Sequence, residues 1–405
     1  MTLIVQKYGG SSVATAERLR HVAARVVETR RLGAAVVVVV SAPGDTTDEL
    51  IARAREISAR PPARELDMLM AVGEQISIAL LSMAVQELGQ EAISLTGMQV
   101  RILTDGVHTK ARILEIDHRR IDAELARGRV VVVAGFQGVT PDLEITTLGR
   151  GGSDVTAVAL ASALGAESCE IYTDVPGVFT ADPRIVPEAQ QLHRLSYDEM
   201  LEMASSGAVV LQTRSVEYAK FARVRLHVRS TWSDAPGTVV EEGPEMERVR
   251  LVTGVTHDLD VARLTIRDLP DVPGIAHRIF SALAARQVNV DMIVQTASRG
   301  GRADISFTVS RSEAAAAEEA AREVGREIGG EVAPAEDVAK VSIVGAGMAS
   351  NPGVASAMFG ALAEEGVNIQ MISTSEIKVS CVIPLEDVQK AVRTVHRAFN
   401  LDALR

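Results

Sequence analysis

The chain has 405 residues, 47% of them hydrophobic and 23% charged, and it carries a formal net charge of −11. This length is too great for one ordinary core, so about two or three domains are expected. The acidic balance argues against a nucleic acid or an anionic membrane as partner, because either would require a basic face. The sequence has no apolar run of about 18 residues and no basic leader followed by an apolar segment, so no membrane span is expected.

Only two cysteines occur, Cys169 and Cys381. Two cysteines in a chain of this length do not imply a disulfide framework, which is typical of proteins in a reducing compartment. We therefore expect a cytoplasmic protein.

Short runs of β-branched residues alternate with longer helical segments from the start of the chain to about residue 230. The runs include "LIVQKY", "AAVVVVVS", "RVVVVAGF" and "ESCEIYTD". Strands that lack polar alternation are buried on both faces, which predicts a mainly parallel sheet covered by helices. We expect an α/β domain over residues 1–232, followed by a linker rich in proline, glycine and acid at 233–250.

The rest of the chain contains a repeat. The segment from Val261 to Ile293 is echoed by the segment from Val338 to Ile372, and each copy predicts a strand, a Pro-Gly loop, an amphipathic helix and a second strand. Two copies are too few for a solenoid. We predict two small modules packed against each other, at 251–337 and 338–405. The strand near 251–257 belongs to the first module or is shared with the second.

The stretch "IVQKYGGSSV", from Ile4 to Val13, places a lysine, two glycines and two serines at the end of the first predicted strand. Glycines let the backbone approach a ligand and a following helix offers free N–H groups, so the stretch suits an anion. It is not a P-loop, because that motif occurs nowhere in the chain. A strand-to-helix turn that needs glycine for its dihedral angles explains the stretch equally well.

The stretch "TTLGRGGSDVTAVALA", from Thr146 to Ala161, places Arg150 among glycines before an apolar helix that Ser153 or Asp154 caps. An arginine beside a glycine turn suits bidentate capture of a carboxylate, and Asp154 could hold a metal ion or an ammonium group. A glycine-rich loop with an ordinary helix cap explains Ser153 but not the arginine.

The stretch "YTDVPGVFTADPRIVPEA", from Tyr172 to Ala189, follows a buried strand. Ligands bind at the carboxyl ends of parallel strands, so this loop could contact a nucleotide through four residues, Thr173, Asp174, Asp182 and Arg184. The same residue patterns are also common in simple turns.

These three motifs occur in one order with "SAPGDTTDEL" from Ser41 and "VGEQIS" around Glu74, ahead of two Pro-Gly modules. The combination resembles the aspartokinases, which belong to the amino acid kinase family, over nearly the whole chain. The resemblance implies an amino acid kinase fold with a mainly parallel central sheet, followed by two ferredoxin-like ACT modules. It also implies ATP-dependent phosphorylation of the side-chain carboxylate of L-aspartate to 4-phospho-L-aspartate, the first step toward lysine, threonine and methionine.

That reaction is chemically compatible with the motifs. A carboxylate with a pKa of about 4 is ionised at neutral pH, so such a kinase needs no general base. It needs alignment of two anions and neutralisation of charge on the transferring phosphoryl group. Glycines, a lysine and an arginine can supply both.

The resemblance implies roles for individual residues. It assigns catalysis to Lys7, Gly10 and Asp154, with Asp154 acting through the amino group of aspartate, water or Mg²⁺. It assigns substrate contacts to Ser41, Thr47, Glu74, Arg150, Gly151, Gly152 and Ser153. It assigns nucleotide contacts to Lys7, Tyr8, Gly9, Gly10, Thr173, Asp174, Phe179, Thr180, Ala181, Asp182, Pro183 and Arg184. ATP and Mg²⁺ are the implied cofactors, and no residue is assigned as a protein metal ligand.

Two positions depart from the family pattern. Gln75 stands where many relatives have arginine, which is tolerable because Glu74 is kept. Val209 stands where the family commonly has a lysine that reaches ATP. The loss of that cation predicts weaker ATP binding, or its replacement by Arg214 or Lys220.

The paired modules resemble the ACT domains that bind amino acid effectors. The implied effector residues are Asp271, Gly274, Ile275, Ala276, Asn289, Val290, Gln295, Val354, Asn368, Ile369 and Glu376. Lysine and threonine, alone or together, are the expected effectors, and the modules are expected to form a homo-oligomer. Met246 is a candidate internal start for a separate regulatory subunit, which would give an α₂β₂ assembly.

Other interpretations remain open at this point. Gly345 and Gly347 follow a predicted strand as in a dinucleotide-binding site, but Ser350 replaces the third glycine. Another amino acid kinase, acting on glutamate, acetylglutamate or a nucleoside monophosphate, is the nearest alternative. An amino acid sensor with a degenerate kinase domain, suggested by Val209, is the non-enzymatic alternative.

Overall fold

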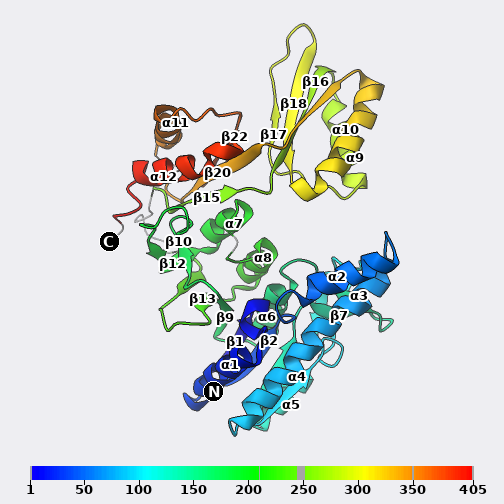
Figure 1. Cartoon of the computed structure of the whole chain (residues 1–405), viewed down its shortest axis with the longest axis vertical. Coiled ribbons are helices and arrows are strands. Elements are labelled where there is room, and N and C mark those ends of the chain that lie inside the picture. The colour runs from blue at the N-terminus through cyan, green and yellow to red at the C-terminus, as the bar shows by residue number, and fades with distance from the viewer. Residues whose placement is uncertain (1, 209, 244–250, 349–350, 404–405) are drawn as a thin grey trace. The chain divides into compact units, whose positions relative to one another are not determined.

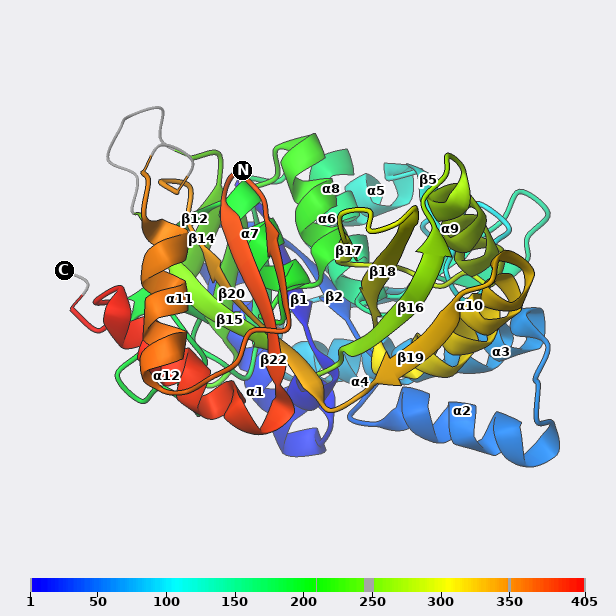
Figure 2. The same ribbon diagram turned by 90° about the horizontal axis from the view of Figure 1, so that it is seen from above.

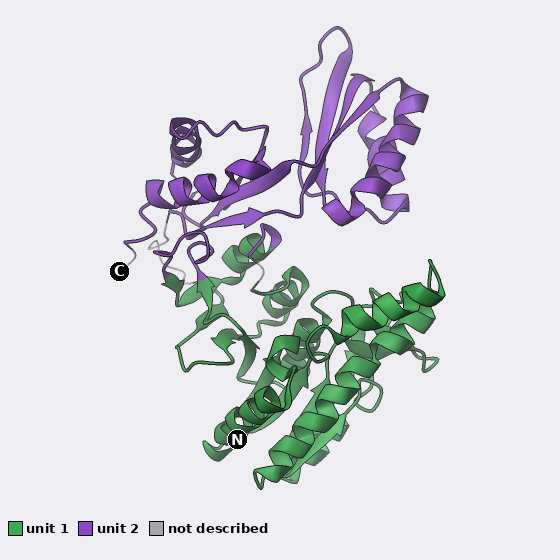
Figure 3. Ribbon diagram, in the orientation of Figure 1, with its two compact units in different colours: residues 1–178, 191–204, 209–245 green, residues 179–190, 205–208, 246–405 purple. Residues whose placement is uncertain are grey.

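The computed structural model describes residues 2–208, 210–243, 251–348 and 351–403. The chain divides into two compact units, each built from more than one chain segment (Figure 3). Unit 1 comprises residues 1–178, 191–204 and 209–245, and unit 2 comprises residues 179–190, 205–208 and 246–405.

Unit 1 is built around an eight-stranded sheet with the order β12-β14-β13-β9-β1-β2-β6-β3. The strands are β1 (Leu3–Tyr8), β2 (Ala35–Val40), β3 (Ala92–Leu95), β6 (Val130–Ala134), β9 (Ser168–Thr173), β12 (Arg194–Ser196), β13 (Leu226–Ser230) and β14 (Thr238–Glu241). Every pair from β13 to β3 is parallel, and β14 runs antiparallel to β13. The predicted α/β fold with a mainly parallel central sheet is therefore confirmed.

Helices cover both faces of this sheet because its strands are apolar on both faces. The helices of unit 1 are α1 (Ala16–Arg31), α2 (Thr46–Ile57), α3 (Ala63–Met70), α4 (Val72–Glu87), α5 (Arg119–Ala126), α6 (Gly152–Ala163), α7 (Tyr197–Ser205) and α8 (Thr213–Ala222). Val36 and Val38 of β2 pack with residues of α1 and α4, which lie side by side in both views (Figures 1 and 2). Helix α6 contacts β1, β2 and β9.

A second, smaller sheet in unit 1 has the order β5-β4-β7-β8. Its strands are β4 (Ile102–Thr104), β5 (Ile113–Ile116), β7 (Gln137–Val139) and β8 (Ile145–Thr147). The last of these strands leads directly into the glycine-rich turn around Arg150. A short hairpin pairs β10 (Val178–Phe179) with β11 (Gln191–Leu192).

One helical stretch, Ala63–Glu87, is long and apolar enough to cross a membrane by length and composition alone. Half of its most apolar window is buried inside the protein, and α4 within it packs against α1, β3 and β6. The core helix of a globular domain has these same properties.

Unit 2 contains two antiparallel four-stranded sheets, and each carries two helices. The first has the order β17-β18-β16-β19, with strands β16 (Ala262–Pro270), β17 (Ile293–Gln295), β18 (Arg302–Val309) and β19 (Glu331–Ala335) and helices α9 (Ile275–Ala285) and α10 (Ala314–Ile328). The second has the order β15-β20-β22-β21, with strands β15 (Gly254–Asp258), β20 (Val338–Val344), β21 (Met371–Thr374) and β22 (Lys378–Pro384) and helices α11 (Val354–Glu364) and α12 (Val388–Ala398).

Both repeats adopt the predicted order of strand, Pro-Gly loop, helix and strand. Strand β15 precedes the first module in sequence but pairs with β20, so it belongs to the sheet of the second module. Strand β20, which precedes Gly345, is antiparallel to both of its neighbours. A dinucleotide site would require a parallel βαβ unit at that point, so the glycines there do not form one.

Two segments that precede the expected linker also belong to unit 2. Residues 179–190 contribute Ala181, Ile185, Val186 and Ala189 to the hydrophobic core of the second module. Residues 205–208 contact the second module through Ser205, whose O accepts a hydrogen bond from the buried Lys340 ammonium at 3.4 Å. Both segments fall within the range expected for the amino-terminal domain, because short apolar loops carry no signal of the core that they will join.

Candidate active site

The carboxyl ends of β1, β2, β6 and β9 meet at one edge of the main sheet, because these strands are adjacent and parallel. Lys7 is the last residue but one of β1, in register with Val39 of β2 and Ile171 of β9. The turn after β1 begins where Ser12 N–H donates to Gly9 O at 2.9 Å. The edge of the sheet therefore positions the predicted anion-binding stretch.

Gly10 is in close contact with the turn that follows β2. Gly44 N–H donates to Gly10 O at 3.0 Å, and a Cβ atom at position 10 would lie 2.7 Å from Ala42 O and 3.0 Å from Gly44 O. These contacts are with backbone atoms, which cannot rotate away as a side chain can. Gly10 is therefore required for the close approach of the two turns. A simple strand-to-helix turn would not need glycine for this reason, so the contact favours the anion-site interpretation.

The Lys7 ammonium lies 2.6 Å from Asp154 Oδ1. The two side chains are only 12% and 8% exposed. Asp154 lies in the first turn of α6, and Gly151 before it adopts a left-handed conformation with φ of 72°. The structure thus brings together the two predicted catalytic side chains at the amino end of a helix, where N–H groups favour anions.

Glu74 lies at the start of α4 and is 2% exposed. Its Oε1 accepts a hydrogen bond from Ala42 N–H at 3.0 Å, whereas its buried Oε2 has no partner among the described residues. Burial raises the pKa of this carboxyl to about 7. A buried carboxylate oxygen without a partner is costly, so it indicates a place for a cation or an ammonium group.

Arg150 is exposed on the turn between β8 and α6 and makes no hydrogen bond or ion pair with any residue that the structure describes. It is therefore available to an anionic group. Ser153, which follows it, is buried, and Ser41 and Thr47 after β2 are half-buried.

The predicted nucleotide residues fall into two groups. Thr173 is the last residue of β9 and Asp174 follows it, and the Thr173 hydroxyl donates to Asp174 Oδ1 at 3.1 Å. The Tyr8 ring is fully buried and stacks on Tyr172 with ring centroids 4.6 Å apart, so only its backbone can reach a ligand. The group from Phe179 to Arg184 belongs wholly to unit 2, where Thr180 Oγ1 is 2.9 Å from His396 Nε2.

Position 209, where valine replaces the expected lysine, lies outside the described residues. The two cations considered as replacements are both engaged. Arg214 donates to two backbone carbonyls, and Lys220 Nζ donates to Asp198 Oδ1 at 2.6 Å.

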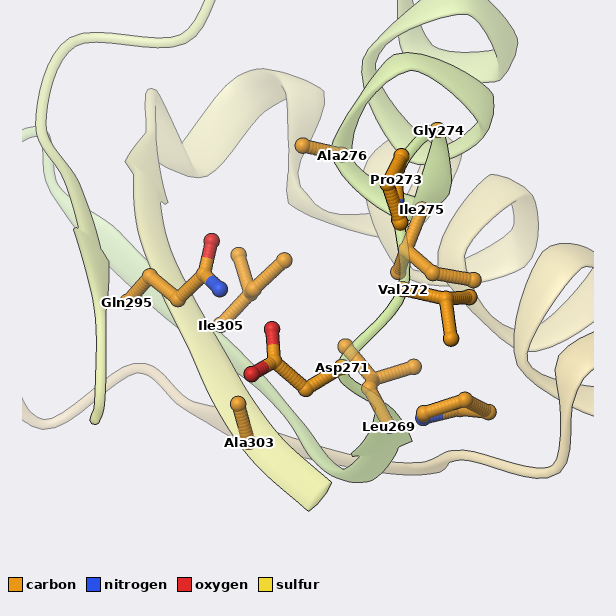
Figure 4. A pocket seen from close by; sticks show the side chains of 11 residues that line it. Leu269, Asp271, Val272, Pro273, Gly274, Ile275, Ala276, Gln295, Ala303 and Ile305 are labelled. Atoms are coloured by element: carbon orange, nitrogen blue, oxygen red, sulfur yellow. The ribbon is translucent and has the colours of Figure 1, made fainter. Parts of the chain in front are cut away.

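A cavity of about 370 Å³ lies in the first module of unit 2. It brings together five of the predicted effector residues, Asp271, Gly274, Ile275, Ala276 and Gln295. Figure 4 shows the Asp271 carboxylate and the Gln295 amide pointing toward the same space beside Ile305. Asn289 and Val290 do not line this cavity, because Asn289 is exposed near Glu313 and Val290 packs on the module's core.

The predicted effector residues of the second module lie at the start of α11 and on either side of β21. Val354 is buried at the first position of α11, and Ile369 packs on the module's core. Asn368 and Glu376 are exposed.

The sequence did not predict a role at the Arg150 turn for a group of polar side chains, chiefly the buried Asp67 and Thr147 and the half-buried Arg214. Asp67 is one aspartate in an amphipathic helix, and Arg214 is one arginine at a helix start. Neither has a local signal, because each acts on residues far away in the sequence.

Comparisons with known proteins agree with this arrangement. Residues 2–230 match the amino acid kinase family, and residues 263–326 and 341–399 each match an ACT domain. The chain is 52% identical over 408 residues to the aspartokinase of Mycolicibacterium smegmatis, covering 99% of this chain and 97% of that protein. It is also 52% identical over 404 residues to the aspartokinase of Thermus thermophilus, covering 99% and 100%.

Solved structures give the same result. The structure of E. coli aspartokinase III in complex with aspartate and ADP (R-state) has a TM-score of 0.84 and 26% identity, covering 98% of this chain and 99% of that one. The structure of the same enzyme in complex with lysine and aspartate (T-state) has a TM-score of 0.76 and 25% identity, covering 98% and 99%. With these matches over its full length, the chain belongs to the aspartokinase family, as an amino acid kinase domain followed by two ACT domains.

Proposed function

We propose that this kinase transfers the γ-phosphoryl group of ATP to the side-chain carboxylate of L-aspartate, forming 4-phospho-L-aspartate and ADP. The observation that carries the proposal is the buried, unpartnered Oε2 of Glu74 at the strand ends that also hold the Lys7–Asp154 pair. An amino acid substrate offers an ammonium group that can pair with Glu74. Phosphorylation of its carboxylate creates an anionic reaction centre that Lys7 can stabilise. E. coli aspartokinase III, a structural relative, binds aspartate and ADP.

In the proposed reaction Glu74 accepts the α-ammonium group of aspartate, and Arg150 binds its α-carboxylate by a bidentate contact. Ser41, Thr47 and Ser153 complete the substrate site. A side-chain carboxylate oxygen attacks the γ-phosphorus, and the new O–P bond forms as the bond to the β,γ-bridging oxygen breaks. ADP leaves with the electron pair of that bond, and no proton has to be removed from the acceptor.

Lys7 and the N–H groups of Gly9 and Gly10 stabilise the charge on the transferring phosphoryl group. Thr173 and Asp174, with the backbone of Tyr8 and the segment Phe179 to Arg184, are proposed for the nucleotide. The Lys7 ammonium then exchanges part of its contact with Asp154 for phosphate oxygens.

The residues present fit a Mg²⁺ ion that is held mainly by the nucleotide. The described residues contain no group of three or more His, Cys, Asp or Glu side chains arranged to bind a metal. Mg²⁺ in kinases is bound by one or two carboxylates plus substrate phosphates, and Asp154 is the carboxylate nearest the reacting centre. When bound, the ion would neutralise phosphate charge.

We propose that lysine, threonine or both inhibit the enzyme by binding the ACT modules, with the cavity around Asp271 and Gln295 as the site in the first module. Lysine is bound by E. coli aspartokinase III in its T-state structure. The reaction would then be the feedback-regulated first step toward lysine, threonine and methionine, in the cytoplasm.

The division into a catalytic domain at 1–232, a linker and two modules remains part of the proposal, as does assembly through the ACT modules. Met246, the candidate start of a separate regulatory subunit, lies outside the described residues. N-terminal sequencing of the native protein tests the internal start, because a separate regulatory subunit requires a fragment that begins at Met246.

The activity is tested by trapping the acyl phosphate with hydroxylamine in the presence of Mg-ATP, with L-aspartate, L-glutamate, N-acetyl-L-glutamate or a nucleoside monophosphate as acceptor. The proposal predicts a hydroxamate with aspartate only, at a rate that falls when lysine and threonine are added. Product with another acceptor would identify a different amino acid kinase. No product, with retained lysine or threonine binding, would identify a sensor.

A further inference from the structure

The turn that carries Arg150 is held by two polar side chains, one buried and one half-buried, that lie outside the proposed substrate site. These are Asp67, on α3, and Arg214, on α8. Both contact the residues that immediately precede Gly149 and Arg150. All of these residues belong to unit 1.

Asp67 is completely buried. It accepts hydrogen bonds from the Thr147 hydroxyl at 2.5 Å, from His108 Nδ1 at 2.7 Å and from Thr109 N–H at 3.0 Å. Burial of a carboxylate is costly unless hydrogen bonds compensate it, and donors from two separate chain segments do so here. The carboxylate thereby fixes the end of β8 and the loop around Thr109 in one geometry.

Arg214 joins the same two segments, through Leu148 after β8 and Ala111 in the loop. Its Nη1 donates to Leu148 O at 2.6 Å and its Nη2 donates to Ala111 O at 3.2 Å, while Ala111 N–H donates to Thr147 O at 3.0 Å. Arg214 lies in the first turn of α8, where the helix dipole disfavours a cation. An arginine at this position therefore adds little to the stability of α8. Its hydrogen bonds to the two carbonyls explain why it lies there.

The turn itself has little freedom to adapt. Gly149 and Gly151 both adopt positive φ angles, 77° and 72°. A Cβ atom at Gly149 would lie 3.0 Å from Thr109 O, and one at Gly151 would lie 2.1 Å from the Gln212 side chain. A displacement of Leu148 would therefore be transmitted to Arg150.

We propose that Arg214 and Asp67 are positioning residues for aspartate, which fix the Arg150 turn through Leu148 O and the Thr147 hydroxyl. The proposal rests on the proposed role of Arg150 in binding the substrate carboxylate. It assigns Arg214 to the amino acid substrate and not to ATP, although Arg214 was a candidate replacement for the cation missing at position 209. A misplacement of about 1 Å in such a contact reduces activity on the order of 10²-fold.

The first test is Arg214→Lys, which keeps the charge but cannot bridge two carbonyls with a planar fork. The KM for aspartate should rise by about tenfold or more, while the KM for ATP stays within about twofold. The matched control is Arg225→Lys, because Arg225 is exposed and makes an ion pair with the half-buried Glu241 at 3.1 Å in the same unit. The control should leave both constants unchanged.

A second pair of variants covers the case in which Arg214→Lys fails to fold. Thr147→Val removes the hydroxyl that donates to Asp67 without changing the side-chain volume, and Thr147→Ser keeps it. The valine variant should show the same selective rise in the KM for aspartate. The serine variant should have the KM of the wild type. A purely structural role would lower the amount of active enzyme and leave both KM values unchanged.

Arg150→Lys separates the possible failures. If it raises the KM for aspartate but the Arg214 and Thr147 variants do not, the positioning role is wrong and the substrate site stands. If Arg150→Lys has no effect on the KM for aspartate, the positioning role and the proposed substrate site are both wrong. Equal rises in the KM for ATP and for aspartate in the Arg214 variant would also overturn the positioning role.

Discussion

Glu74 combines a buried position with an oxygen that has no partner among the described residues, and this makes it sensitive to pH. Burial raises its pKa to about 7, so a substantial fraction of the substrate-free protein carries a neutral Glu74 at neutral pH. Only the ionised form can pair with the α-ammonium group of aspartate. Substrate binding should therefore weaken as the carboxyl becomes protonated.

The direction of the pH effect follows from this pKa. Below pH 7 the ratio of protonated to ionised Glu74 grows tenfold per pH unit, so the KM for aspartate should rise by nearly that factor between pH 6.5 and 5.5. Above pH 8 the KM should be flat. Steady-state kinetics with aspartate varied at each pH measures this.

Glu74→Gln provides the control. It should raise the KM for aspartate at every pH, because the amide cannot pair with the ammonium group, and it should remove the slope below pH 7. The same slope in the wild type and the variant would mean that another group titrates and that Glu74 does not receive the ammonium group.

At the scale of elements, the contact between the turns after β1 and β2 depends on the absence of a side chain at Gly10. Gly10→Ala would place a methyl group 2.7 Å from Ala42 O and 3.0 Å from Gly44 O. The two turns must separate to accommodate it. We expect kcat/KM to fall on the order of 10²-fold, because the phosphoryl-binding backbone is displaced.

Gly360→Ala is the matched control for this substitution. Gly360 lies inside α11, and nothing lies within 4 Å of a Cβ atom built there. Activity should be unchanged and the melting temperature equal or slightly higher, because alanine favours a helix. Full activity of Gly10→Ala, measured beside this control, would show that the turn is not part of the phosphoryl site.

Much of the element structure was predictable because it is encoded locally. The valine-rich runs predicted a parallel sheet, and the Pro-Gly repeat predicted two modules of the same design. The proximity of Lys7 and Asp154 followed only from a family resemblance, since 147 positions separate them, and the structure places them 2.6 Å apart. Asp67 and Arg214 were not predictable, because their role depends on tertiary contacts with the Arg150 turn.

At the scale of the whole molecule, the chain crosses between the two units several times. It leaves unit 1 after residues 178, 204 and 245, and it returns after residues 190 and 208. The segment 179–190, which includes most of the proposed nucleotide contacts of the third motif, is part of the second module's core. No local periodicity indicates this, so the sequence predicted a simple division at the linker.

A fragment that starts at Met246 would lack this segment. Ala181, Ile185, Val186 and Ala189 would no longer cover the apolar residues of the second module. We expect the fragment 246–405 to self-associate and to unfold at a lower temperature than the corresponding transition of the full chain. Size-exclusion chromatography and calorimetry measure both properties, and a monomer of unchanged stability would contradict the packing described for residues 179–190.

The regulatory proposal makes a separate prediction. Asp271→Ala removes the one carboxylate that, among the residues that the structure describes, lines the cavity in the first module. The concentration of lysine for half-inhibition should rise about tenfold or more, as expected for a lost charge-assisted hydrogen bond, with little change in kcat without effector. Inhibition curves at fixed aspartate and ATP measure this effect.

The control for that variant is Glu319→Ala, on the exposed face of α10 in the same module. It should leave the inhibition curve unchanged. If Asp271→Ala also leaves the curve unchanged, lysine does not bind in this cavity.

We propose that the strand ends around Lys7 and Asp154 form a site for phosphoryl transfer to aspartate. The rate of aspartyl hydroxamate formation by the wild type and by Lys7→Ala, with Mg-ATP and saturating aspartate, tests this site. We expect product from the wild type and a loss on the order of 10²-fold or more in kcat for the folded variant, because the cation on the transferring phosphoryl group is gone. Equal rates for the two proteins, or no aspartate-dependent product from the wild type, would contradict it.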